Sequence, residues 1–170
     1  MEASDLKMRY RFYLLTFLVF VVDHWTKWIV RTRMDLHDHI EVIPNYLRIS
    51  YVRNSGVAFS LFEQIQSVWK PYLLAAMAVI AVIVIVVYSV RMSTDRTLLQ
   101  VALAVTLGGI LGNFTDRIVH KFVVDFIELH FQDRFHWPTF NVADSAITVG
   151  IALLLLDTVK NPEPQEKELA

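Results

Sequence analysis

The chain has 170 residues, of which 55% are hydrophobic, with a net charge of -1, no cysteine and a mean hydropathy of +0.42. This length suits one domain, and the composition is too apolar for an ordinary soluble domain. The near-neutral charge gives no polybasic surface for nucleic acid, and the lack of cysteine excludes disulfides, thiol catalysis and cysteine-bound zinc. We therefore expect residues 1–170 to form one integral membrane domain.

Four apolar stretches predict four membrane-spanning helices. The first, at about residues 12–30, continues through polar residues without a small-x-small cleavage site, so we expect a retained helix rather than a cleaved signal peptide. The second, residues 71–90, contains no charged residue and matches a hydrocarbon core about 30 Å thick. The third and fourth are expected at residues 97–115 and 142–159.

The third span ends in a glycine motif followed by polar residues. Gly108 and Gly112 have the small-xxx-small spacing that lets helix backbones approach closely. Asn113, Asp116 and Arg117 follow at i, i+3 and i+4, so they share one helix face. Either they form a polar helix end at the membrane interface, or they form a network that orients a site, and we favour the network.

Two outer loops are expected, at residues 31–70 and 116–141, and a disordered tail at residues 160–170. The alternation of apolar and polar residues from Leu47 to Arg53 predicts a half-buried strand, and Asn54-Ser55-Gly56 then supplies a turn. Residues 57–62 are again strand-like, so a small sheet on the membrane surface is expected. Residues 118–140 read as a connector near the lipid headgroups.

Four spans place both termini on one side of the membrane. Lysine and arginine are denser on that side, which favours cytoplasmic termini. Asp23, Asp125 and Asp144 then gather near the outer face. Asp23 and Lys27, four residues apart, are either an internal salt bridge or neighbours of a catalytic centre.

Asp125 and Asp144 are the strongest candidates for chemistry, because each lies among apolar residues and a charge beside hydrocarbon is costly. Two carboxylates close together cannot both stay ionised, so one can hold a proton while the other acts as a base. We hypothesise that they form such a pair. The alternative is that Asp144 only completes a capping box with Asn141, with Asp125 an ordinary interfacial acid.

Other chemistries have weaker support. The six histidines include no HExxH motif, and His37 and His39 lie in a loop, so a zinc site is not expected and these two residues receive no role. Ser145 lacks a nucleophile-elbow context. A proton relay through Asp23, Asp125 and Asp144 would spread acids across the membrane depth, and a non-enzymatic assembly protein would not need two aspartates in one site.

Five motifs occur in order along the chain: VDHWTK at residues 22–27, RNSGVAF at 53–59, GGILGNFTDR at 108–117, VDF at 124–126 and FNVADSA at 140–146. Together with the four spans they resemble the bacterial lipoprotein signal peptidases (signal peptidase II), a family of small intramembrane aspartyl peptidases. The resemblance covers about residues 12–157.

The resemblance implies an all-α membrane fold, a four-helix bundle with a small outer-face β-cradle and a short periplasmic helix. It implies an endopeptidase that cuts diacylglyceryl-modified prolipoproteins just before the lipidated cysteine, without a cofactor or metal. It further implies a bacterial inner-membrane location, contact with membrane lipids and inhibition by globomycin; we expect a monomer. By motif match, Asp125 and Asp144 are implied as the catalytic residues, and the site-lining or supporting residues are Asn54, Gly56, Asn113, Arg117, Asn141, Asp116, Asp23 and Lys27.

Overall fold

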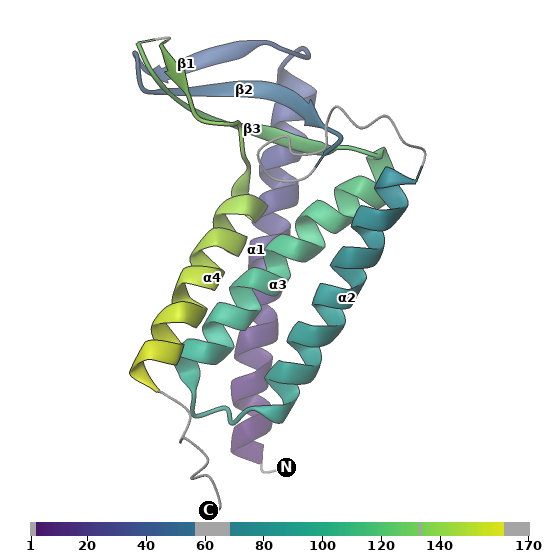
Figure 1. Cartoon of the computed structure of the whole chain (residues 1–170), viewed down its shortest axis with the longest axis vertical. Helices are drawn as coiled ribbons and strands as arrows, with labels where there is room; N and C mark the ends of the chain where they lie inside the picture. Colours follow the sequence, from purple (N-terminus) through teal and green to yellow (C-terminus); the bar gives the residue numbers. More distant parts are fainter. Residues whose placement is uncertain (1–2, 57–68, 133, 162–170) are drawn as a thin grey trace, which may run out of the picture.

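The computed structural model describes residues 3–56, 69–132 and 134–161. Four helices stand side by side, and a small sheet covers one end of the bundle (Figure 1). The first residues of the first helix and the last residues of the fourth lie at the opposite end (Figure 1). This arrangement agrees with the predicted four-helix membrane bundle with a sheet on one face.

The four helices are α1 (Ala3–Arg33), α2 (Lys70–Arg91), α3 (Thr97–His120) and α4 (Val142–Lys160). Each is long and apolar enough to cross a membrane. α1 and α3 extend beyond the expected spans, because the polar residues that flank the apolar stretches remain helical. Asp116 in the extension of α3 is buried, whereas the described residues at the two ends of α1 are exposed or half-buried. The expected strand-like residues 57–62 and most of the expected tail lie outside the described residues, and the described part of the chain contains no additional short helix.

α3 is the central helix, packing against α1, α2 and α4. Glycine makes this possible: a β-carbon at Gly109 would lie 2.5 Å from the carbonyl oxygen of Ala143 in α4. A β-carbon at Gly112 would lie 2.5 Å from Oδ2 of Asp23 in α1. The small residues of α3 therefore serve packing within one chain and bring the polar ends of α1 and α4 together.

The sheet has the order β1-β2-β3-β4 and is antiparallel throughout, with β1 at His39–Ile43, β2 at Leu47–Asn54, β3 at Val123–Phe131 and β4 at Phe135–His136. β2 contains the strand predicted from alternation. The interpretation of residues 118–140 as a connector was wrong in part, because β3 and β4 lie within it. The first four residues of β3 are buried on both faces, so this strand lacks the alternation that identified β2.

A small core fixes the sheet to the bundle. Val30 of α1, Tyr51 of β2 and Val124 and Phe126 of β3 are buried against one another. Because both Val124 and Phe126 are anchored, Asp125 between them is held at a fixed position above the helices.

A charged cluster on the sheet fixes the pairing of β2 and β3. Arg48 and Glu128 are cross-strand partners, and the guanidinium donates two hydrogen bonds to the carboxylate, of 2.8 and 2.7 Å. Ser50 and His136 also contact this carboxylate. Burial raises the pKa of Glu128, but the hydrogen bonds outweigh burial and hold it at about 2. The pair is therefore ionised at neutral pH and specifies the register.

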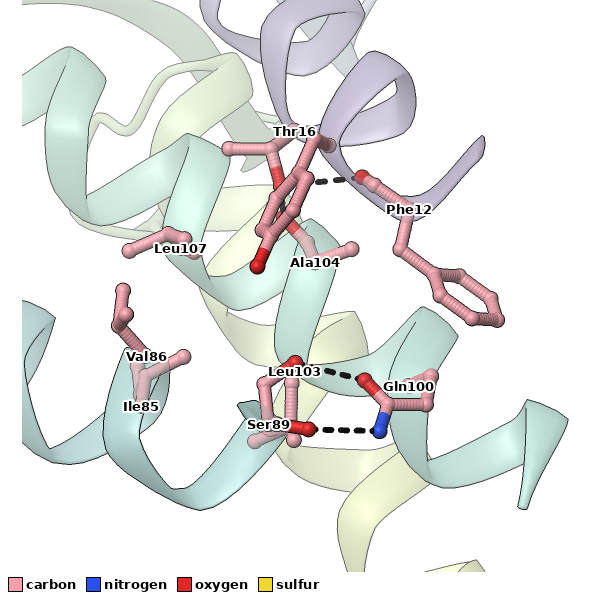
Figure 2. A pocket seen from close by; sticks show the side chains of 10 residues that line it. Phe12, Thr16, Ile85, Val86, Ser89, Gln100, Leu103, Ala104 and Leu107 are labelled. Atoms are coloured by element: carbon pink, nitrogen blue, oxygen red, sulfur yellow. Dashed lines mark hydrogen bonds between the residues drawn. The ribbon is translucent and has the colours of Figure 1, made fainter. Parts of the chain in front are cut away.

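Several polar side chains inside the bundle, away from the sheet, form hydrogen bonds between helices (Figure 2). Thr16 of α1 donates to the carbonyl oxygen of Ala104 in α3 at 3.0 Å. Ser89 of α2 donates to the Gln100 side chain at 2.6 Å, and Gln100 donates back to the Ser89 carbonyl at 3.0 Å. The space that these residues line holds only about 10 Å³, room for one water molecule at most, so it is packing rather than a ligand site.

Candidate active site

Asp125 and Asp144 come from separate segments and line one cavity. Asp125 is the third residue of β3, and Asp144 is the third residue of α4. The cavity, of about 430 Å³, lies where the sheet meets the first turns of α4. Its wall is mainly apolar, with polar groups concentrated at the two carboxylates, as in many small-molecule and peptide sites.

Asp125 accepts hydrogen bonds on both carboxylate oxygens. Asn54 Nδ2 donates to Oδ2 at 2.8 Å, and Asn141 Nδ2 donates to Oδ1 at 2.7 Å. Both amides are fixed in this orientation, because their carbonyl oxygens accept the backbone N–H groups of Gly56 and Asp144. Both oxygens of Asp125 are thus held by donors, and a proton on this carboxyl has to point elsewhere.

Asp144 is held by the start of its own helix and by α3. Asn141 is the N-cap of α4, and the capping box is complete: the Asn141 side chain accepts the Asp144 N–H, and the Asp144 side chain accepts the Asn141 N–H at 3.2 Å. Asn113 Nδ2 donates to the other carboxylate oxygen at 2.8 Å. The capping box and the polar network are therefore both present, and Asn141 connects the two aspartates.

A buried ion cluster lies beneath this network. Lys27 Nζ is 2.7 Å from Asp23 Oδ2 and 3.1 Å from Asp116 Oδ2, and it donates to Asn113 Oδ1 at 2.9 Å. Asp23, Lys27 and Asp116 are 0%, 2% and 3% exposed. Asp23 also accepts the N–H of Ala143 at 2.9 Å. The salt bridge that the sequence offered as one alternative is present, and its lysine also contacts Asn113, which binds Asp144.

Arg117 links the end of α3 to the loop after β2. It donates to the carbonyl oxygen of Gly56 at 3.1 Å and to that of Asn113 at 3.2 Å. Its positive charge acts on Asp144, Asp125 and Asp116. Arg117 therefore balances part of the negative charge of the site.

The pKa of Asp125 is far above that of an ordinary aspartate. Burial, and next the negative charge of Asp144, raise the pKa of Asp125 to about 7, although the hydrogen bonds from Asn54 and Asn141 oppose this shift. A carboxyl that titrates near neutral pH beside a second carboxyl is suited to acid–base chemistry.

The sequence analysis did not identify one wall of the cavity, residues 137–140. Trp137, Pro138, Thr139 and Phe140 lie between β4 and α4 and line the cavity beside both aspartates. The only sequence signal was a proline among aromatic residues directly before the N-cap.

His39 is the first residue of β1, and His37 lies just before it. Among the residues that the structure describes, no group of three or more histidine, aspartate or glutamate side chains could hold a metal.

Comparisons with known proteins agree with this architecture. The model of the family described as signal peptidase (SPase) II matches residues 15–160. A lipoprotein signal peptidase of Alteromonas mediterranea is 39% identical over 93% of this chain and 85% of its own length. One of Ectopseudomonas mendocina is 43% identical over 92% of each. A solved structure of a bacterial membrane enzyme superposes with a TM-score of 0.79 at 31% identity, covering 94% of both chains.

Proposed function

Because the chain belongs to the signal peptidase II family, and is therefore a membrane protease, we propose that Asp125 and Asp144 are the catalytic pair with which it removes signal peptides from prolipoproteins. The observation that carries this assignment is that one side chain, Asn141, hydrogen-bonds Asp125 and caps the helix that holds Asp144. The bond to be cut is the peptide bond before a diacylglyceryl-modified cysteine.

The proposed reaction is general acid–base hydrolysis without a covalent intermediate. Asp125 carries the proton at rest and donates a hydrogen bond to the scissile carbonyl oxygen. Ionised Asp144 takes a proton from a water molecule, whose oxygen attacks the carbonyl carbon. When the C–N bond breaks, the departing amine receives a proton from the pair, which returns to its resting state.

The assignment of the resting proton follows from the surroundings of the two groups. Burial, and next the negative charge of Asp144, raise the pKa of Asp125 to about 7, so this carboxyl can keep its proton up to neutral pH. Asn54, Gly56, Asn113, Arg117 and Asn141 are supporting residues in this proposal, because they fix the two carboxylates. Asp23, Lys27 and Asp116 support Asn113 and the start of α4 from below.

The test is cleavage of a diacylglyceryl-modified prolipoprotein by the purified protein in detergent, with the products identified by mass spectrometry. A new amino terminus at the lipidated cysteine is the expected result. A folded protein that releases no peptide, or that cuts elsewhere, would contradict the proposal.

The same assay measures the pH dependence of the pair. Below pH 7 Asp125 holds its proton, and as the pH rises through about 7 it ionises and the acid is lost. We expect kcat/KM to fall about tenfold per pH unit above pH 7. Since the Asn54 hydrogen bond lowers the pKa of Asp125, Asn54→Ala should move this fall to higher pH. A flat profile from pH 6 to pH 9 would argue against Asp125 as the acid.

The multi-pass helices lie, in our proposal, in the bacterial inner membrane, with the termini in the cytoplasm and the sheet and aspartates near the outer face. The chain has no cysteine, so single cysteines report on sidedness. Ser55→Cys, near the sheet, should react with an impermeant maleimide in cells whose outer membrane has been permeabilised. Ser93→Cys, between α2 and α3, should react only after lysis, and the reverse pattern would invert the proposed orientation.

We also propose that the enzyme acts as a monomer and that globomycin occupies the cavity. The first is checked by the mass of the detergent-solubilised protein, and a dimer would contradict it. The second is checked by competition between globomycin and the prolipoprotein, and non-competitive inhibition would place the inhibitor elsewhere.

A further inference from the structure

The main chain of Thr139 is a polar part of the cavity wall that the proposed mechanism leaves unused. Residues 137–140 run along β3: Trp137 N–H donates to Leu129, and Phe140 exchanges two hydrogen bonds with Ile127, of 3.0 and 2.8 Å. This segment therefore continues the sheet on the side of β3 that faces away from β2.

The peptide geometry fixes the direction of the Thr139 carbonyl. Peptide bonds in the described residues are trans, so the carbonyl oxygen of one residue points opposite to the N–H of the next. Phe140 N–H points at β3, and the Thr139 carbonyl therefore points away from β3. We take the Thr139 N–H to lie on the same side as this carbonyl, as it does in a strand residue. Neither group has a hydrogen-bond partner within residues 3–56, 69–132 and 134–161.

Thr139 lines the same cavity as Asp125 and Asp144. Pro138, which precedes it, has no N–H. Thr139 is therefore the residue of this pair that can offer both a donor and an acceptor at the edge. An extended peptide can add to such an edge as a strand, and its main chain then provides affinity without regard to side chains.

We propose that Thr139 is a positioning residue whose N–H and C=O pair with the main chain of the substrate next to the scissile bond. This inference rests on the proposed function. A pairing through the main chain holds an extended peptide in one register against the two carboxylates, whatever the sequence of the substrate. Positioning of this kind lowers the barrier by fixing the reacting groups before reaction.

Two substitutions at residue 139 separate the main chain from the side chain. Thr139→Pro removes the N–H but leaves the Phe140 groups that pair with β3. Thr139→Val keeps the N–H and the shape of the side chain. We expect kcat/KM to fall at least tenfold for Thr139→Pro and less than threefold for Thr139→Val, with similar thermal unfolding temperatures.

A set of lipidated substrate peptides, each with one amide replaced by an ester, removes substrate N–H donors one at a time. With wild type, we expect one ester, within about three residues of the scissile bond, to lower kcat/KM about tenfold. With Thr139→Pro the same ester should cost less than threefold. Proline keeps the carbonyl that accepts this substrate N–H, but its ring replaces the neighbouring N–H and holds the substrate strand away from that carbonyl. A purely structural effect of proline would not change the ester penalty.

The outcomes are distinct. If wild type cleaves the peptides but no ester is selectively harmful, or if the penalty is equal in wild type and Thr139→Pro, the pairing is wrong and the proposed function stands. If Thr139→Pro does not fold, the ester series measured with wild type and Thr139→Val tests the pairing instead. Equal kcat/KM values for all esters would then overturn the pairing. If wild type cleaves no lipidated peptide, the proposed function itself fails.

Discussion

Replacing Asp125 or Asp144 with asparagine is expected to lower the rate of prolipoprotein cleavage by at least 10²–10⁴-fold, the usual contribution of positioned proton transfer. Asparagine keeps the shape of aspartate but cannot exchange the proton. Each single variant should lose nearly as much as the double variant, because the two carboxyls act as one unit. Initial rates at pH 6–7, with variant concentrations raised to detect residual cleavage, measure the effect.

The fold should survive these changes. Burial raises the pKa of Asp125, so an ionised Asp125 costs folding free energy once the pH exceeds its ordinary value, and this cost is complete above about pH 7. Asparagine removes this cost, although its NH₂ group must face one of the two donors, Asn54 or Asn141. Thermal unfolding within a few degrees of wild type is expected for Asp125→Asn.

Asp38→Asn is the matched control. Asp38 is exposed in the turn before β1, at the same end of the molecule, and its described hydrogen bonds use its backbone. Full activity of Asp38→Asn together with wild-type rates for Asp125→Asn or Asp144→Asn would remove that aspartate from the catalytic pair.

Lys27→Met is expected to destabilise the folded protein by about 3–5 kcal/mol. Methionine nearly matches the length of the lysine stem, but it leaves Asp23 and Asp116 buried without their cation. Asn113 also loses the closer of the two donors to its carbonyl oxygen, which leaves Asn141 Nδ2 at 3.2 Å, so its hydrogen bond to Asp144 is oriented less firmly. Both the free energy of unfolding and the cleavage rate should therefore fall.

The same substitution at Lys121 is the control for Lys27→Met. Lys121 is exposed just after α3, and among the described residues its ammonium donates only to the carbonyl of Ile118. Lys121→Met should therefore change stability by about 0.5 kcal/mol or less. Adding Asp23→Asn to Lys27→Met should restore part of the lost stability by removing one unpaired charge. Equal unfolding curves for Lys27→Met and Lys121→Met would contradict the role of the ion cluster.

The membrane spans were predictable because hydropathy is a property of consecutive residues. The uncharged residues 71–90 are contained in α2, whereas α3 extends past residue 115 to His120. The polar end of α3 is stabilised by residues distant in sequence: Lys27 binds Asp116, and Arg117 binds the loop at Gly56. A prediction that ends the helix where the local sequence becomes polar cannot take account of contacts with such distant residues.

The sheet was predictable only in part. Apolar and polar residues alternate along β2, and such alternation is visible in the sequence. β3 begins with consecutive buried residues, including Asp125, and its place in the sheet depends on pairing with β2 about 75 residues earlier. For the same reason the sequence identified the two aspartates as candidates but did not show that Asn54 and Asn141 would hold Asp125 from opposite sides.

The Asn141 side chain, which caps α4 and also binds Asp125, has a consequence for biogenesis. α4 is the last helix of the described chain to leave the ribosome, and its first turn holds Asp144. Until that helix has formed and its cap has closed on β3, the two aspartates are not joined. In the proposed mechanism a partly inserted chain therefore has no assembled catalytic pair, and we expect activity only when the bundle is complete.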